Sequence, residues 1–250
     1  MQTIRMEEMN WVDIKEAINN GFRTAVIGIG SIEQHGPHLP TLTDALTAEI
    51  FANRVASRLK SALQAPTIRV GCSDHHLDFF AISYSSSTLK AVIRDYVNSL
   101  ARQGITSIVL LPSHGGNFKP LKEVVEILEQ EKPGLKLVAI TDLMAFFESL
   151  NDIASEFGVT KEEAGAHSGE TETSIILSLA GNLVKKERFT QGYLGPMGAE
   201  ESQMVFERGL TTLTENGILG DPRNATSEKG EVYVEKIVDY IVEEVSKQLS

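Results

Sequence analysis

Apolar runs and amphipathic segments alternate along the chain. Short, nearly uninterrupted apolar runs predict buried strands, because a strand covered on both faces has no polar side. These runs lie at 24–29, 67–72, 106–112 and 135–140. Apolar residues that recur every three or four positions predict helices. The predicted helices cover 13–20, 43 or 44 to 63, 88–103, 117–131, a segment beginning at 142, 172–179 and 227–249. This alternation predicts βαβ units, and therefore an α/β fold with a mostly parallel central sheet.

Three stretches lack this regularity. A loop is expected at 73–87, where two adjacent histidines stand, and loops of this length in compact domains are usually functional. The polar stretch 150–166 is expected to be irregular, as a lid or an oligomer contact. Residues 182–224 hold several glycines and are expected to form loops with one short helix at 200–208. No repeat, low-complexity tail or linker interrupts the pattern, so we expect one domain over 1–250.

Composition limits the classes of function. The chain is 42% hydrophobic and 23% charged, which is typical of globular proteins, and its net charge is −11. This acidic balance argues against a partner that is nucleic acid or an anionic membrane. The single cysteine, Cys72, is expected to be a small buried apolar residue rather than a nucleophile. No signal-peptide pattern is visible, and no apolar run approaches the roughly 20 residues needed to span a bilayer, so we expect a cytoplasmic protein.

The first chemistry-bearing segment follows the predicted strand at 24–29. Glu33 and His35 are two apart, so on extended chain their side chains point to the same side, and Asp44 lies nine positions further on. Carboxylate with imidazole suits Zn, Mn or Fe better than Ca or Mg. Taken alone, Asp44 would be an N-cap and His35 an ordinary loop histidine. The Gly-Pro-His-Leu-Pro turn at 36–40 would hold the side chains rigidly, which favours metal ligation.

The second segment follows the strand predicted at 106–112. His114 stands there before Gly115 and Gly116. Carboxyl ends of parallel strands meet at one edge of a sheet, where ligands bind, so this loop is expected to meet the first. The paired glycines let backbone approach a ligand and expose N–H groups as oxyanion donors. A plain turn before the helix at 117 would explain the glycines but not His114.

The third segment begins at His167 and leads into the helix predicted at 172–179. It also holds Glu170 and Glu172, two positions apart. On a helix these two carboxylates are roughly 200° apart, so only one of them would face a metal ion. The other would cap the helix or orient a ligand.

Together the three segments resemble the creatininase (creatinine amidohydrolase) family, and the resemblance covers essentially the whole chain. The matching residues are Glu33 to Pro40 with Asp44, His114 to Asn117, and His167 to Thr173, with a late Gly-Ile-Leu-Gly-Asp-Pro at 217–222. The resemblance implies a three-layer α/β/α sandwich, a centre of two divalent metal ions (Zn, Mn or Fe) and hydrolysis of a non-peptide C–N bond, often in a homohexamer.

The resemblance also implies a ligand set. One metal ion would be held by Glu33 and His114, the other by His35 and a late glutamate, and Asp44 would bridge them. The late glutamate is expected to be Glu172.

One feature of the second segment departs from true creatininases, which are similar to His-Tyr-Glu-Asn where this chain has His-Gly-Gly-Asn. The ligand carboxylate that they carry at the position of Gly116 is missing, so Glu172 is expected to replace it, with Glu170 as the alternative. The glycine form is more similar to relatives that deformylate a formamidopyrimidine nucleotide or cleave a peptide precursor. Residues 78–83 also depart from the family's Phe-Pro-Gly-Thr, so substrate contacts there are not transferred.

The expected function is metal-dependent hydrolysis of an amide, cyclic amide or formamide in a small molecule. Hydroxide formed at the metal centre would attack the carbonyl. His167 is expected to carry the proton to the leaving nitrogen, since imidazole titrates near neutral pH, and Glu170 is the second candidate catalytic residue. Two alternatives remain: a metal-dependent peptidase with a longer groove, walled by 150–166, and a non-catalytic metal-binding scaffold. The expected partners are a small-molecule amide and further copies of the chain, with no nucleic acid and no membrane.

Overall fold

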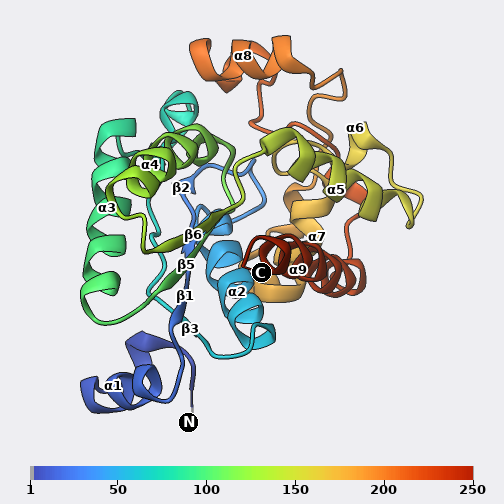
Figure 1. Ribbon diagram of the computed structural model, residues 1–250. Helices are drawn as coiled ribbons and strands as arrows, with labels where there is room; N and C mark the ends of the chain where they lie inside the picture. The colour runs from blue at the N-terminus through green and yellow to red at the C-terminus, as the bar shows by residue number, and fades with distance from the viewer. Residues whose placement is uncertain (1–2, 250) are drawn as a thin grey trace.

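The computed structural model describes residues 3–249 of the chain, and a parallel four-stranded sheet forms its centre (Figure 1). The strand order is β3 (Ala62–Gln64), β1 (Thr24–Ile29), β5 (Ser107–Pro112) and β6 (Lys136–Ala139). Every neighbouring pair is parallel, and β1 and β5 pair along their whole length. The predicted α/β fold with a parallel central sheet is therefore confirmed.

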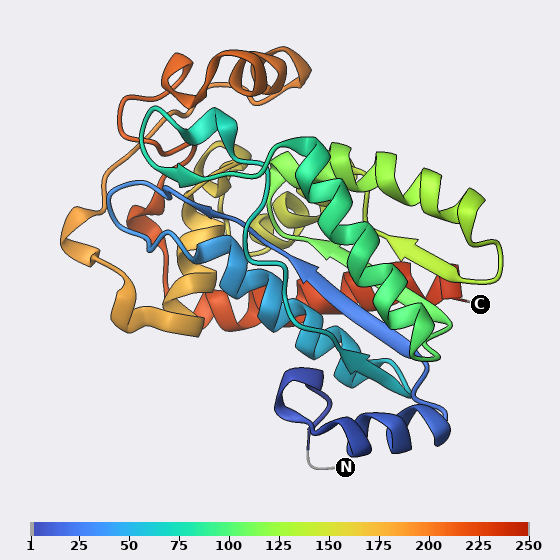
Figure 2. The same cartoon turned by 90° about the vertical axis from the view of Figure 1, so that its left-hand side faces the viewer.

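Helices cover both faces of this sheet (Figures 1 and 2). The face seen from the front in Figure 2 carries α3 (Ser86–Arg102) and α4 (Phe118–Glu131). The opposite face carries α2 (Thr43–Arg58) and α9 (Ser227–Leu249), with α7 (Glu170–Ala180) packed on α9. The remaining α-helices are α1 (Trp11–Asn19), α5 (Leu143–Ser155), α6 (Lys161–Ala164) and α8 (Ala199–Arg208). The 3-10 helices are η1 (Met6–Glu8), η2 (Asp74–His76), η3 (Gly115–Asn117), η4 (Gly181–Leu183), η5 (Lys186–Arg188), η6 (Leu210–Thr212) and η7 (Pro222–Asn224).

Two apolar cores, one on each face, explain why the strand sequences are apolar throughout. Successive side chains of a strand point to opposite faces. Ile27 therefore packs in the core beneath α3 and α4, whereas its neighbour Val26 packs in the core beneath α2 and α9. Each helix turns one apolar side toward the sheet, and in α3 this side includes Leu89 and Ile93. Both cores rest on the same sheet, and one domain over 1–250 stays a prediction.

A second, two-stranded sheet lies past the carboxyl end of β1. β2 (Ile32–Glu33) pairs antiparallel with β4 (Ala81–Ile82), and Glu33 stands opposite Ala81. The loop predicted at 73–87 therefore contains η2 and a strand, and it returns to the segment that carries Glu33.

Two predictions about the elements were wrong. Residues 67–72 form no strand and make only one isolated bridge, between Ile68 and Ile29, while the edge strand is β3, which we expected to be the end of a helix. α2 ends at Arg58 because the buried Ala62 and Leu63 pair with β1, and Pro66, which has no N–H, follows that strand.

The stretch 150–166 is also more regular than expected. α5 continues to Ser155, and α6 begins after a capping box in which Thr160 and Glu163 bond to each other's backbone N–H groups. Residues 182–224 form loops and short 3-10 helices around α8, which begins one residue before its predicted start. The strand at 24–29 and the terminal helix at 227–249 have the predicted bounds. Among residues 3–249, no helix is both long and apolar enough to cross a bilayer.

Candidate active site

The first segment places three donor side chains at the carboxyl end of β1. Glu33 ends β2 and is fully buried. The chain then turns back, with a bridge between His35 and Leu39, and enters α2 at Thr43. Asp44 therefore lies in the first turn of α2, where helix dipoles favour a carboxylate, and its Oδ1 is 3.3 Å from Nε2 of His35.

His114 joins this group because β5 is the neighbour of β1. The two parallel strands end side by side, and His114 follows β5 by two residues. Its Nδ1 lies 3.2 Å from Oε1 of Glu33 and 3.2 Å from Oδ2 of Asp44. The two segments meet as expected at the carboxyl edge of the sheet.

The third segment brings His167 and Glu172 to the same place. His167 bridges to Leu219, and Ser168, with a left-handed φ of 57°, turns the chain into α7. Oε1 of Glu172 is 4.0 Å from Nε2 of His35, and Nδ1 of His167 is 3.9 Å from Oε1 of Glu33. All three segments thus converge, and Glu172 is the glutamate of α7 that faces the group.

Glu170 lies elsewhere. It is fully buried, and its two carboxylate oxygens accept hydrogen bonds from Ser174 Oγ (2.9 Å), Lys229 Nζ (3.0 Å) and Tyr233 OH (3.0 Å). Because residues two apart on a helix point in nearly opposite directions, Glu170 faces α9 while Glu172 faces the cluster. This geometry argues against the expected catalytic role of Glu170, because both oxygens are engaged in joining two helices.

Two histidines of η2 belong to the site and were not among the expected residues. Nε2 of His76 is 3.0 Å from Oε1 of Glu33, and the ring of His75 stacks on His114 with centroids 5.4 Å apart. The length of the 73–87 loop, which is typical of functional loops, could have indicated these two histidines from the sequence. The chain just before these histidines also explains why residue 116 is glycine. A Cβ atom at Gly116 would collide with the backbone oxygen of Cys72, so this backbone arrangement leaves no room there for the glutamate that true creatininases carry.

The burial of these groups changes their proton affinities. Burial alone would lower the pKa of His35, but the nearby Asp44, Glu172 and Glu33 carboxylates raise it to about 9. Burial likewise opposes ionisation of Asp44, yet His35 and His114 hold its pKa below the ordinary range. For Glu172, burial together with the charges of Asp44 and Glu33 raises the pKa to about 7, although His35 opposes the rise.

Burial also lowers the pKa values of two imidazoles in the group. The pKa of His167 is well below its ordinary value, first through burial and then through the charge of His35. The pKa of His76 falls for the same first reason, with His167 and His75 adding to the effect. Both are therefore neutral near pH 7, the form in which imidazole accepts a proton or binds a metal ion.

The donor atoms fit a divalent metal centre. Both oxygens of Glu33, Nε2 of His35 and Oδ2 of Asp44 are buried and make no hydrogen bond. Buried polar atoms are nearly always bonded, so a cluster of four without partners requires an explanation. The side chains form three overlapping groups, and inside each group one donor atom per residue lies within 4.8 Å of the others. The groups are Glu33 with His35 and Asp44, His35 with His167 and Glu172, and Glu33 with His76 and His167. A cation bound among them would compensate the buried charges.

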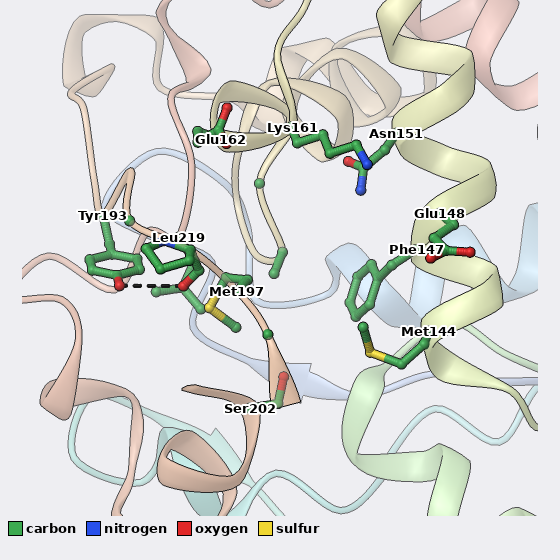
Figure 3. Close-up of a pocket in the computed structure, with 15 residues that line it drawn as sticks. Met144, Phe147, Glu148, Asn151, Lys161, Glu162, Tyr193, Met197, Ser202 and Leu219 are labelled. Carbon is green, nitrogen blue, oxygen red and sulfur yellow. Dashed lines mark hydrogen bonds between the residues drawn. The ribbon is translucent and has the colours of Figure 1, made fainter. Parts of the chain in front are cut away.

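A substrate can reach this cluster from one side. A cavity of about 70 Å³ is lined by His75, His114, His167 and Phe206. It shares residues with a larger cavity of about 340 Å³, among them Phe147, Ala166 and Met197. Figure 3 shows the larger cavity between the α5 side chains Met144, Phe147 and Asn151 on one side and Tyr193, Met197 and Leu219 on the other.

Comparisons with known proteins agree with this geometry. The family model described as "Creatininase: Creatinine amidohydrolase" matches residues 7–245. A mycofactocin precursor peptide peptidase of Mycobacterium tuberculosis (strain CDC 1551 / Oshkosh) is 31% identical over 89% of this chain and 84% of its own length. The creatinine amidohydrolase of Pseudomonas putida is 24% identical over 99% and 98%. A 2-amino-5-formylamino-6-ribosylaminopyrimidin-4(3H)-one 5'-monophosphate deformylase of Methanobrevibacter smithii is 27% identical over 89% and 88%.

Solved structures show the same fold. A manganese form of creatininase superposes with a TM-score of 0.81 at 22% identity, covering 99% of each chain. A zinc–zinc form of a creatininase mutant superposes with a TM-score of 0.82 at 23% identity, again covering 99% of each chain. With the family model matched over nearly the whole sequence, the chain belongs to the creatininase family of metal-dependent hydrolases.

Proposed function

We propose that this chain hydrolyses an amide, cyclic amide or formamide C–N bond of a small molecule at a centre of two divalent metal ions. The observation that carries the proposal is the set of buried donor atoms without hydrogen bonds around Glu33, His35 and Asp44. Glu33 and His114 would hold one ion, His35 and Glu172 the other, and Asp44 would lie between the two. When bound, such a pair supplies Lewis acidity and lowers the pKa of water toward neutrality.

His167 is the proposed proton carrier. Its side chain is only 9% exposed, lines the smaller cavity and points Nδ1 toward Glu33. Burial keeps the imidazole neutral, so it can take a proton from water and deliver it to the leaving nitrogen. An alternative role is ligation, since His167 also belongs to two of the donor groups. Retention of two ions with a large loss of kcat in His167→Ala would support the proton carrier, whereas loss of an ion would support the ligand.

A second candidate function is cleavage of a short peptide. The larger cavity favours it, because a volume of about 340 Å³ next to the cluster exceeds what a formamide needs, and α5 and α6 form one wall through Asn151, Lys161 and Glu162. The mycofactocin precursor peptide peptidases among the relatives add support. A peptide would occupy the larger cavity with its scissile bond in the smaller one.

The test is a substrate panel assayed with added Zn, Mn or Fe. Small formamides and cyclic amides are compared with short peptides, and release of formate, amine or amino acid is measured. Turnover of the small amides supports the first function, and cleavage of peptides alone supports the second. Metal binding without either activity would leave a scaffold and contradict the proposal. The variant Glu33→Gln should be inactive, while Glu123→Gln, on the exposed side of α4, is its matched control.

We also propose a homo-oligomer, hexameric by the family resemblance, and a cytoplasmic location. Leu77, Phe80 and Ile82 support assembly, because these large apolar side chains lie close together in sequence and are each more than half exposed. The single cysteine fits a reducing compartment. Light scattering coupled to size-exclusion chromatography measures the oligomeric state, and a monomer would contradict the assembly.

A further inference from the structure

The side-chain amide of Gln34 contacts two imidazoles of the site. Its Nε2 lies 3.0 Å from Nδ1 of His76 and 3.1 Å from Nε2 of His167. The same nitrogen donates to the backbone oxygen of Gly217 at 3.2 Å. Gln34 stands between two candidate ligands in the sequence, and its side-chain amide reaches imidazoles of the same cluster.

The backbone fixes the orientation of this amide. The N–H of Gly36 donates to Oε1 of Gln34 at 2.8 Å, and the oxygen of Gly217 accepts from Nε2. Exchanging Oε1 and Nε2 would set two donors against each other at Gly36 and two acceptors against each other at Gly217. The NH₂ group therefore faces His76, and Nδ1 of His76 must accept from it.

This contact decides where the hydrogen of His76 lies. A neutral imidazole that accepts at Nδ1 carries its hydrogen at Nε2. Nε2 of His76 is 3.0 Å from Oε1 of Glu33, so the nitrogen that carries the hydrogen lies beside a buried carboxylate. His76 therefore has no lone pair available for a metal ion at that nitrogen.

The contacts of Gln34 also determine which nitrogen of His167 carries the hydrogen. The two hydrogens of the Gln34 amide go to Gly217 and His76, which leaves none for His167. Nε2 of His167 is 2.9 Å from the backbone oxygen of Gln34, and a carbonyl oxygen only accepts. Nε2 of His167 therefore carries the hydrogen, and Nδ1 keeps its lone pair on the side that faces Glu33.

We propose that Gln34 is a positioning residue that fixes the hydrogen of both His76 and His167 on Nε2. His76 then presents an N–H rather than a lone pair to Glu33, and His167 is the imidazole that offers an open nitrogen to the cluster. Donation of the second imidazole N–H to a carbonyl is also what orients histidines at metal sites. The inference goes beyond the proposed function, because the positions of the hydrogens can be measured whether or not any amide is cleaved.

The first test is nitrogen-15 NMR of the zinc-loaded protein labelled in its histidine rings. His76→Asn and His167→Asn assign the signals. The expected spectrum has His76 and His167 each protonated at Nε2 alone. A hydrogen on Nδ1 of His76 would overturn the proposal, and it is also what ligation of zinc through Nε2 would produce.

The second test changes the donor. In Gln34→Glu the new carboxylate has no hydrogen to give, so Nδ1 of His76 is expected to become protonated, and kcat to fall about 10–100-fold, as for other partners that orient ligands. Gln64→Glu is the matched control, because Gln64 is also buried but bonds to Asn53 and to the backbone of Glu49. It should leave both imidazoles unchanged.

Gln34→Met covers the case in which Gln34→Glu does not fold. Methionine neither donates nor accepts strongly at this position, so His76 is expected to show a mixture of its two neutral forms. If His76 keeps its hydrogen on Nε2 alone in whichever of these variants folds, Gln34 does not set the pattern and the proposal fails.

Discussion

Two clusters of buried acidic groups meet at α7, which contributes Glu170 to one and Glu172 to the other, and they differ in how their charges are compensated. Glu170 is surrounded by Lys229, Tyr233 and Ser174, so each oxygen has a donor. The cluster around Glu33 and Asp44 has several buried oxygens with no hydrogen bond. A satisfied buried carboxylate holds helices together, whereas an unsatisfied group at the carboxyl edge of a sheet requires a ligand.

The substitution expected to have the largest effect on the metal cluster is at Asp44. Asp44→Asn removes the charge that we place between the two ions, so metal content should fall by at least one ion and kcat/KM by at least about 100-fold, more than is typical for partners that only orient ligands. Metal analysis and steady-state kinetics measure both effects. A variant that keeps two ions and full activity would contradict the assignment.

Lys229→Met should lower the stability of the fold and leave metal binding unchanged. It leaves Glu170 buried without its cation, and breaking a buried ion pair typically costs about 3 kcal/mol or more of unfolding free energy. Because the Lys229 side chain is 22% exposed, we expect about 3 kcal/mol rather than the upper end of that range. Denaturant unfolding measures it, and metal content should stay unchanged. Loss of metal at full stability would mean that the two clusters are not separate.

Metal addition sharpens the same contrast. If only the folded chain binds the ions, free metal at about 100 times its dissociation constant stabilises it by about 2.7 kcal/mol. Thermal unfolding with and without a chelator should show this shift in wild type and in Lys229→Met. In Asp44→Asn the shift should shrink or vanish. An equal shift in all three proteins would point to binding outside the cluster.

The smallest expected effect is at Tyr233. Tyr233→Phe removes one hydrogen bond to Glu170, and a bond to a charged group contributes about 1.5–3 kcal/mol. We expect the lower end, because Lys229 and Ser174 remain. Activity per bound metal should not change. A drop in activity larger than the drop in stability would link this cluster to the chemistry.

The sequence predicts much of the site because one rule governs its position. Glu33, His35 and Asp44 follow one central strand and His114 follows its neighbour, so a parallel sheet brings them to one edge. The sequence does not predict features that are determined by contacts between distant parts of the chain. β3 is three residues long and is set by pairing with β1, and the choice between Glu170 and Glu172 depends on Lys229, which lies 59 positions later in the chain. His76 depends on the fold of its own loop.

Anomalous diffraction from crystals grown with zinc would locate the two ions that we place in the cluster. We expect two peaks about 3.5–4 Å apart, with Asp44 between them, Glu33 and His114 at one, and His35 and Glu172 at the other. Absence of both peaks, or peaks away from these five side chains, would contradict this placement.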